Sequence, residues 1–305
     1  MTTNSTATAV DPAQVVGRVL DLLREHYVFP DVAAAIASHL EARWADRAYD
    51  GLESASLATS VTADLQAANG DRHLRLVFHP EPLPDEDDDA RDDAEMAAWA
   101  ASTDDGVARA QRLDGAVGLL ELAPILFPPS NAAETVGAAF TSLSDAAALV
   151  LDLRECLGGD PEMVSFACTY LFGIEAVHLN DIVERAGRET RQFWTLPYVP
   201  GTRFGPDKPV YVLTSNRTFS GGEELTYDLQ QLRRAVVVGE TTRGGAHPRR
   251  GFRLTDHLEV TVPVARARNP HSGQNWEGIG VRPDVSVAAD QALDVALALA
   301  REALA

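Results

Sequence analysis

The stretch Thr218-Phe-Ser-Gly-Gly-Glu-Glu224 marks the passage from a strand to a helix. The short apolar run Pro209-Val-Tyr-Val-Leu213 before it predicts a buried strand. After it, apolar residues recur at helical spacing, at Leu225, Leu229 and Leu232. Ser220 is therefore expected on the turn, with the free N–H groups of the helix's first turn beside its hydroxyl. That arrangement suits a serine nucleophile with half of an oxyanion hole, although serine is also a common helix N-cap.

Strands and helices alternate on both sides of this turn. Apolar runs predict buried strands at residues 116–122, 147–153 and 235–238. Helices are expected at 131–143, 161–172 and 288–304, and a hairpin at 252–254 and 258–262. Near-continuous apolar strands separated by helices predict an α/β core with a largely parallel sheet.

The N-terminal part of the chain has a different pattern. Residues 11–70 contain three amphipathic segments, which predict an N-terminal three-helix cap domain. Residues 71–305 then form the core domain, which begins with a short strand at 73–78. Residues 81–112 hold two prolines and the acidic run Asp85-Glu-Asp-Asp-Asp89, and we expect an acidic exposed loop there.

Composition excludes several classes of function. The 305 residues include 45 acidic and 26 basic side chains, for a net charge of -19, which disfavours binding to nucleic acid. No segment resembles a signal peptide or a membrane span, and the two cysteines, Cys156 and Cys168, are too few for a disulfide framework. We therefore expect a cytoplasmic protein without membrane attachment. Neither a zinc-type Cys/His cluster nor a nucleotide-binding glycine motif is present, so we expect no metal and no cofactor.

Three further stretches could complete a site around Ser220. The segment Asp152-Leu-Arg-Glu-Cys-Leu-Gly-Gly159 carries a strand into paired glycines, which serve either a tight turn or the close approach of a ligand to the backbone. His73, at the joint between cap and core, could face a cleft as a general base, or simply be packed. Glu277 could orient an imidazole, or cap a turn.

These stretches resemble motifs of one family. The matching segments are Gly70-Asp-Arg-His-Leu74, Asp152-Leu-Arg-x-x-x-Gly-Gly159, Leu213-Thr-Ser-Asn-Arg-Thr-Phe-Ser220, Val238-Gly-Glu-Thr-Thr-x-Gly-Gly-Ala-His247 and Trp276-Glu-Gly-x-Gly-Val-x-Pro-Asp284. In this order they are similar to the tail-specific (C-terminal processing) serine peptidases, in the branch without a PDZ domain. That branch resembles the tricorn core and the repeats of interphotoreceptor retinoid-binding protein. The resemblance implies a core like that of Clp protease and crotonase.

The resemblance also implies roles for individual residues. Ser220 would be the nucleophile, His73 the base and Glu277 the residue that orients the base. The oxyanion hole would combine the Gly221 N–H with one from Gly158 or Gly159. One branch of the family uses a lysine base instead, but Gly244-Gly-Ala246 occupies that position here, which favours the Ser-His-Glu triad. Cys156 stands where the family commonly has asparagine.

The implied function is a serine peptidase that cleaves short or unstructured peptides through an acyl-enzyme. Two alternatives stay open: a non-catalytic binding protein for a small apolar ligand, and an acyl transferase or cyclase that uses the same Ser220. A base of this type titrates near pH 6.5 when unperturbed, and Glu277 as a neighbour is expected to raise the pKa of His73. A homo-oligomer is compatible with the sequence.

Overall fold

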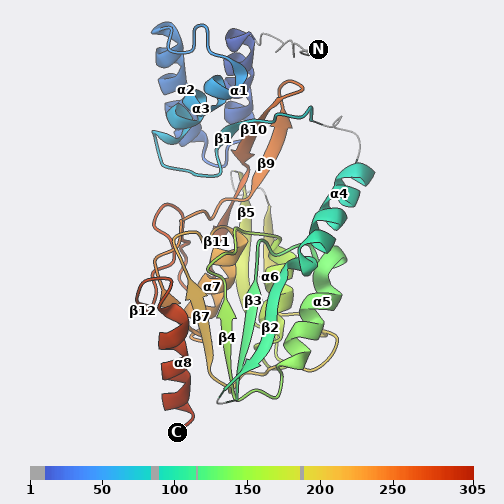
Figure 1. The fold of residues 1–305 in the computed structure, drawn as a ribbon. Coiled ribbons are helices and arrows are strands. Elements are labelled where there is room, and N and C mark those ends of the chain that lie inside the picture. The colour runs from blue at the N-terminus through green and yellow to red at the C-terminus, as the bar shows by residue number, and fades with distance from the viewer. Residues whose placement is uncertain (1–10, 84–88, 115, 186–188) are drawn as a thin grey trace. The chain divides into compact units, whose positions relative to one another are not determined.

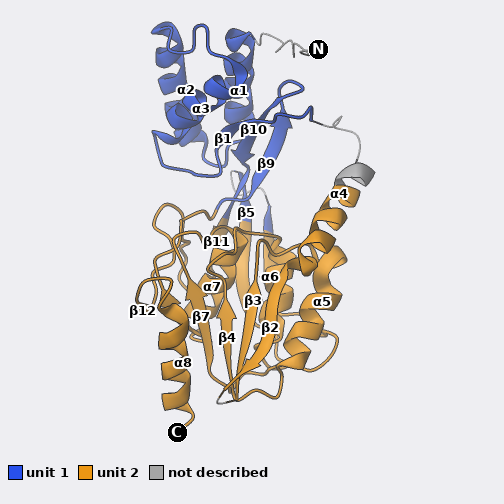
Figure 2. Ribbon diagram, viewed as in Figure 1, with its two compact units in different colours: residues 1–88, 183–190, 247–266 blue, residues 89–182, 191–246, 267–305 orange. Residues whose placement is uncertain are grey.

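The computed structural model describes residues 11–83, 89–114, 116–185 and 189–305. The chain forms two compact units, each drawn from separate stretches of sequence (Figure 2). Unit 1 combines residues 1–88, 183–190 and 247–266. Unit 2 combines residues 89–182, 191–246 and 267–305.

Unit 1 contains three helices and a small antiparallel sheet (Figure 1). The helices are α1 (Pro12–His26), α2 (Pro30–Ala45) and α3 (Ser54–Gln66), close to the three that the sequence predicts. The sheet has the order β1-β10-β9, from β1 (Arg75–Phe78), β10 (Leu258–Pro263) and β9 (Arg249–Arg253). The predicted hairpin is thus confirmed as β9 and β10. One core joins helices and sheet, in which Ile36, Leu57 and Val260 are fully buried.

Unit 2 is built on a six-stranded sheet of order β12-β8-β7-β4-β3-β2. Its strands are β2 (Val107–Leu113), β3 (Val117–Leu122), β4 (Ala148–Asp152), β7 (Val210–Thr214), β8 (Val236–Gly239) and β12 (Val285–Ser286). Every neighbouring pair is parallel except β2 and β3. The predicted α/β core with a largely parallel sheet is therefore confirmed.

Helices cover both faces of this sheet, as Figure 1 shows. Leu149 and Leu151 of β4 share a core with α5 (Pro129–Ser142), α6 (Pro161–Thr169) and α7 (Gly221–Gln231). The intervening Ala148 and Val150 pack in a second core with α8 (Ala292–Ala303). Successive side chains of a strand point to opposite faces, so a sheet covered on both sides needs the unbroken apolar run that β4 has.

The structure also contains a three-stranded sheet that the sequence did not predict. Its order is β11-β5-β6, from β11 (Ala265–Arg268), β5 (His178–Glu184) and β6 (Thr190–Trp194). No helix among the described residues combines the length and the apolarity needed to cross a membrane.

The expected acidic loop at 81–112 is wrong for most of its length. Helix α4 (Asp89–Ser102), the short 3-10 helix η1 (Asp104–Gly106) and strand β2 occupy it. Residues 94–101 are five alanines with one glutamate, one methionine and one tryptophan, and alanine, glutamate and methionine favour helix. Strand β2 forms because it pairs in register with β3, from Arg109 opposite Glu121 to Leu113 opposite Val117. Residues 85–88 of the acidic run lie outside the described residues.

A truncation in the central strand should reveal how much the packed sheet contributes to stability. Leu151 is fully buried, so Leu151→Ala should lower the free energy of unfolding by about 2–5 kcal/mol. Leu304, at the end of α8, is 41% exposed, and Leu304→Ala should cost well under about 1 kcal/mol. Urea unfolding of both variants measures the two values. Equal losses would contradict the core described here.

Candidate active site

Two loops meet at one edge of the unit 2 sheet because β4 and β7 are parallel neighbours. Their register runs from Leu149 opposite Val210 to Asp152 opposite Leu213, so both strands end together. The Thr218 hydroxyl donates to the Leu153 carbonyl at 2.8 Å, and the Phe219 N–H donates to the Cys156 carbonyl at 3.0 Å. These bonds hold the turn that carries Ser220 against the loop that leads to the two glycines.

Ser220 is the N-cap of α7, and its backbone conformation is unusual. Its φ is 48° and its ψ is -120°. An ordinary N-cap residue has an extended backbone with negative φ, whereas positive φ in a non-glycine residue costs of the order of 1–3 kcal/mol. Such strain concentrates at functional sites, where the surrounding bonds hold it in place. The half-buried Ser220 therefore has a backbone conformation that capping alone does not require.

The two glycines after β4 approach Ser220 closely. Gly158 and Gly159 have φ values of 137° and 138°, which residues with a side chain rarely adopt. A β-carbon built on Gly158 would lie 3.0 Å from Ser220 Cβ and 3.6 Å from its Oγ. One built on Gly159 would lie 2.2 Å from the carbonyl oxygen of Leu126. Only glycine fits either position, because the loop lies tightly between Leu126 and the turn that carries Ser220.

The same loop is fixed by backbone and thiol hydrogen bonds. The Leu126 N–H donates to the Gly158 carbonyl at 2.9 Å, and the Asp160 N–H donates to the Leu126 carbonyl at 2.8 Å. The Cys156 thiol donates to the Gly158 carbonyl at 3.5 Å, and burial raises the pKa of this thiol to about 12. Cys156 thus supports the loop as a neutral donor. An oxyanion hole made by Gly221 with Gly158 or Gly159 stays a prediction.

Glu277 lies on a turn that is attached to the loop following β8. One of its carboxylate oxygens accepts the Ala246 N–H at 2.5 Å. The indole N–H of the buried Trp276 donates to the Gly245 carbonyl at 2.8 Å, and the Gly278 N–H donates to the Gly244 carbonyl at 3.2 Å. Three bonds from consecutive residues therefore set the position of Glu277.

His73 belongs to unit 1, on the turn that leads into β1. The backbone N–H of His73 donates to the Asp71 carboxylate at 3.1 Å, and its backbone carbonyl accepts a hydrogen bond from the Thr261 hydroxyl at 2.6 Å. Asp71 is fully buried and also accepts hydrogen bonds from the His247 ring at 2.8 Å and the Tyr27 hydroxyl at 2.9 Å. The backbone of His73 is therefore fixed at both ends.

Burial lowers the pKa of His73 to about 4. The Asp71 carboxylate opposes this shift, while Arg249, His247 and Arg75 add to it. The prediction that the pKa of His73 lies at or above 6.5 is therefore wrong. Desolvation of the imidazolium lowers this pKa by more than the Asp71 carboxylate raises it. Neutral imidazole, the form that can accept a proton, is the stable form at neutral pH.

The predicted site residues thus fall into three groups. The structure brings Ser220 and Gly221 together with the Gly158–Gly159 backbone, and it fastens Glu277 to the loop at 244–246. His73 is held in unit 1 beside Asp71. Its meeting with Ser220 and Glu277 stays a prediction.

One residue of unit 2 that contacts Ser220 was not predicted from the sequence. Glu223 accepts the Ser220 N–H at 2.9 Å. A signal for it was present, because Ser220-Gly-Gly-Glu223 fits the S-x-x-E pattern of a capping box.

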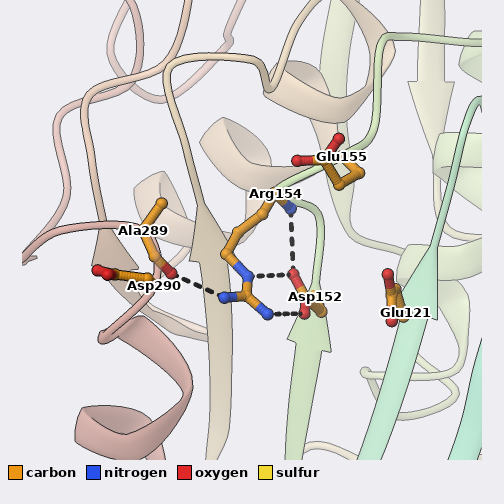
Figure 3. Close-up of a pocket in the computed structure, with 6 residues that line it drawn as sticks. All are labelled: Glu121, Asp152, Arg154, Glu155, Ala289 and Asp290. Carbon is orange, nitrogen blue, oxygen red and sulfur yellow. Dashed lines mark hydrogen bonds and ion pairs between the residues drawn. The ribbon is translucent and has the colours of Figure 1, made fainter.

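A cavity of about 340 Å³ also opens beside the end of β4, and Figure 3 shows its lining. Its charged residues are Glu121, Asp152, Arg154, Glu155 and Asp290. The Arg154 guanidinium donates two hydrogen bonds to the Asp152 carboxylate, at 2.9 and 2.6 Å, and a third to the Ala289 carbonyl at 2.7 Å. Charged residues make up most of this lining, which does not suit a small apolar ligand.

Comparison with known proteins agrees with this geometry. Residues 116–287 match the family described as peptidase family S41, and residues 8–110 match the N-terminal domain of that family in eukaryotic IRBP. The chain is 28% identical over 248 residues to a chloroplastic C-terminal processing peptidase of Tetradesmus obliquus, covering 78% of this chain and 51% of that protein. It thus spans about half the length of this curated relative.

Solved structures share the fold. The photosystem II D1 C-terminal processing protease superposes with a TM-score of 0.54 at 18% identity, covering 92% of this chain and 94% of that one. The tricorn protease superposes with a TM-score of 0.58 at 12% identity, covering 96% of this chain and 37% of that one. The family match extends over more than half of the residues and includes the strand-to-helix turn of Ser220 as well as the paired glycines. The chain therefore belongs to peptidase family S41.

Proposed function

We propose that this chain is a serine peptidase that cleaves short or unstructured peptides through an acyl-enzyme on Ser220. The observation that carries the proposal is the strained Ser220 at the N-terminus of α7, with the Gly158 backbone against its side chain. Membership of peptidase family S41 supports the same conclusion. The peptide substrate, the triad and a cytoplasmic location are all parts of the proposal.

In the proposed reaction, neutral His73 accepts the proton of the Ser220 hydroxyl as Oγ attacks the carbonyl carbon of the scissile peptide. The carbonyl oxygen becomes an oxyanion, stabilised by the N–H groups of Gly221 and of Gly158 or Gly159. When the C–N bond breaks, His73 returns the proton to the leaving amine. Water then attacks the ester in the same way and releases the carboxylic acid. Glu277 orients His73 and supports its transient charge.

Two other functions would use parts of the same site. An acyl transferase or cyclase would share the acyl-enzyme and differ only in the acceptor, an amine or hydroxyl in place of water. A binding protein for a small apolar ligand would need no nucleophile, and the strain at Ser220 and the charged lining of the cavity at β4 argue against it.

Ser220→Ala should abolish covalent labelling by a fluorophosphonate probe, because the attacking oxygen is lost. The free energy of unfolding should change by less than about 2 kcal/mol, even with the loss of a cap. Intact-mass analysis of the native chain and the variant measures labelling. Ser215→Ala is the matched control: Ser215 lies on the same turn and donates to the Arg154 carbonyl, so this variant should still be labelled. Labelling of Ser220→Ala at the native rate would remove Ser220 as the nucleophile.

His73→Ala should slow acylation by an activated ester almost as much as Ser220→Ala, since the base is lost. Glu277→Gln should be milder, because the base stays in place. The control is His271→Ala, which removes an exposed ring that is hydrogen-bonded to the His178 carbonyl. Stopped-flow acylation measures all three variants. A native rate in His73→Ala would exclude the proposed triad, and a loss in His271→Ala of similar size would name a different base.

The depressed pKa of His73 predicts a pH dependence of stability. Because the folded pKa is about 4 and the unfolded value about 6.5, the unfolded chain binds more protons between these pH values. His73 should therefore make the free energy of unfolding fall by up to about 3 kcal/mol as the pH drops from 6.5 to 4. His73→Asn, which cannot titrate, should lack this component. Urea unfolding of both proteins at several pH values measures the difference, and parallel profiles would show that His73 titrates normally.

A further inference from the structure

Glu223 receives an unusual number of hydrogen bonds for one buried carboxylate. One oxygen accepts the Thr242 hydroxyl at 2.5 Å and the Gly244 N–H at 2.6 Å. The other accepts the Gly245 N–H at 2.8 Å and the Ser220 N–H at 2.9 Å. Glu223 is fully buried, and all four partners belong to unit 2. A single side chain therefore bridges the backbone of Ser220 and the loop after β8.

The loop that Glu223 holds is the same loop that holds Glu277. Gly244 and Gly245 accept the Gly278 N–H and the Trp276 indole with their carbonyls, while their own N–H groups face Glu223. The next N–H along, that of Ala246, donates to the Glu277 carboxylate. The path from Ser220 to Glu277 thus consists of one carboxylate, one three-residue loop and direct hydrogen bonds.

The loop at 244–246 is closely packed and has little room to move. Gly244 has a φ of 85°, and a β-carbon built there would lie 3.0 Å from the backbone of Gly278 and of Gly280. Thr242 is fixed on its other side as well, because its hydroxyl oxygen accepts the Val281 N–H at 2.7 Å. Since the loop packs against the Glu277 turn without intervening side chains, a shift of the loop must move the turn with it.

The four hydrogen bonds favour an ionised carboxylate. Three partners are backbone N–H groups, which only donate. The fourth, Thr242, donates when Glu223 is ionised. Burial raises the pKa of Glu223 to about 7, and the four hydrogen bonds act in the opposite direction. Two charged residues adjoin this network in the sequence, and both have other partners. The guanidinium carbon of Arg243 lies 4.8 Å from the centre of the Phe219 ring, and the Glu224 carboxylate accepts a hydrogen bond from the Asn180 amide.

We propose that Glu223 is a positioning residue that sets the nucleophile Ser220 and the carboxylate Glu277 in register with each other. This inference rests on the proposed function, because it gives Glu223 a part in the acylation of Ser220. It assigns no proton transfer to Glu223, which acts through the backbone of Ser220 and through the 244–246 loop.

The test is Glu223→Gln, an isostere that places an NH₂ group among donors. If that group takes the position facing Gly245 and Ser220, two N–H groups lose their acceptor. If it takes the other position, Thr242 can rotate to accept, but the Gly244 N–H is left unpaired. An unpaired buried donor of this kind costs enough to change a rate by about 10- to 100-fold.

We expect Glu223→Gln to lower the acylation rate constant for an activated ester by about 10- to 100-fold, with the dissociation constant of the ester within about threefold of native. The acylation rate of the native chain should fall as the pH drops through about 7, where Glu223 takes up a proton. This acid limb of the pH–rate profile should be absent from Glu223→Gln. The amide hydrogens of Gly244 and Gly245 should exchange faster in the variant. A residue that only stabilised the fold would not remove the limb at pH 7.

The matched control is Glu224→Gln, a buried glutamate one position along the same helix. Its carboxylate accepts a hydrogen bond from the Asn180 amide at 3.0 Å, which a glutamine oxygen can still accept. Acylation should stay within about threefold of native and keep its pH limb. If Glu223→Gln does not fold, Glu223→Asp keeps the charge but is one methylene shorter, and should acylate more slowly than native with the limb retained.

The proposal is overturned if folded Glu223→Gln acylates within threefold of native, keeps the limb at pH 7 and protects Gly244 and Gly245 as the native chain does. A native rate in Glu223→Asp would overturn it equally. If the native chain is not labelled at Ser220 at all, the proposed function fails instead. Amide exchange at Gly244 and Gly245 then still reports whether Glu223 holds the loop.

Discussion

The parallel pairing of β4 with β7 is the constraint on which the rest of unit 2 depends. Parallel neighbours end at the same edge of a sheet, so the loops that follow them begin side by side. The register from Leu149 to Asp152 sets this edge, and the Thr218 and Phe219 bonds to the neighbouring loop then set the turn. A slip by one residue would turn Leu149 and Leu151 toward α8 and would also separate Ser220 from Gly158. Packing and site geometry are therefore fixed together.

Much of this could be predicted from the sequence because the determining signals are local. The apolar run of β4, the strand before Ser220 and the helical spacing after it all lie within short windows, and periodicity reveals them. The failure at 81–112 has a different cause. Strand β2 is mostly exposed and pairs with the next strand along the chain, β3, with Leu113 opposite Val117. Because most of its side chains face solvent, β2 lacks the apolar alternation by which a strand is recognised in a sequence. The acidic residues that begin α4 suggested a loop and hid the helix-favouring composition of that segment.

The make-up of unit 1 could not be obtained from the sequence because its paired strands lie far apart in the chain. Its sheet pairs β1 with β10, from Arg75 opposite Thr261 to Phe78 opposite Leu258. The hairpin of β9 and β10 is recognisable in isolation, but nothing local indicates that its partner lies so far toward the N-terminus. The buried Asp71, which joins His247 to the turn of His73, is subject to the same limitation. Asp71 resembles an ordinary turn residue until its distant partner is known.

The buried carboxylates near Ser220 show how the site separates charge from chemistry. Glu223 and Glu224 lie in the first turn of α7, where the positive end of the helix dipole favours negative charge, yet burial raises the pKa of each to about 7. Four donors surround Glu223 and offset part of the cost of burying its charge, whereas Glu224 accepts a hydrogen bond from the Asn180 amide and lies near Asp160. His73 is buried too, but for a base the same desolvation stabilises the neutral form. Burial therefore shifts the two pKa values in opposite directions: it keeps the imidazole of His73 neutral, and it makes the charge of Glu223 depend on the hydrogen bonds that join Ser220 to the loop of Glu277.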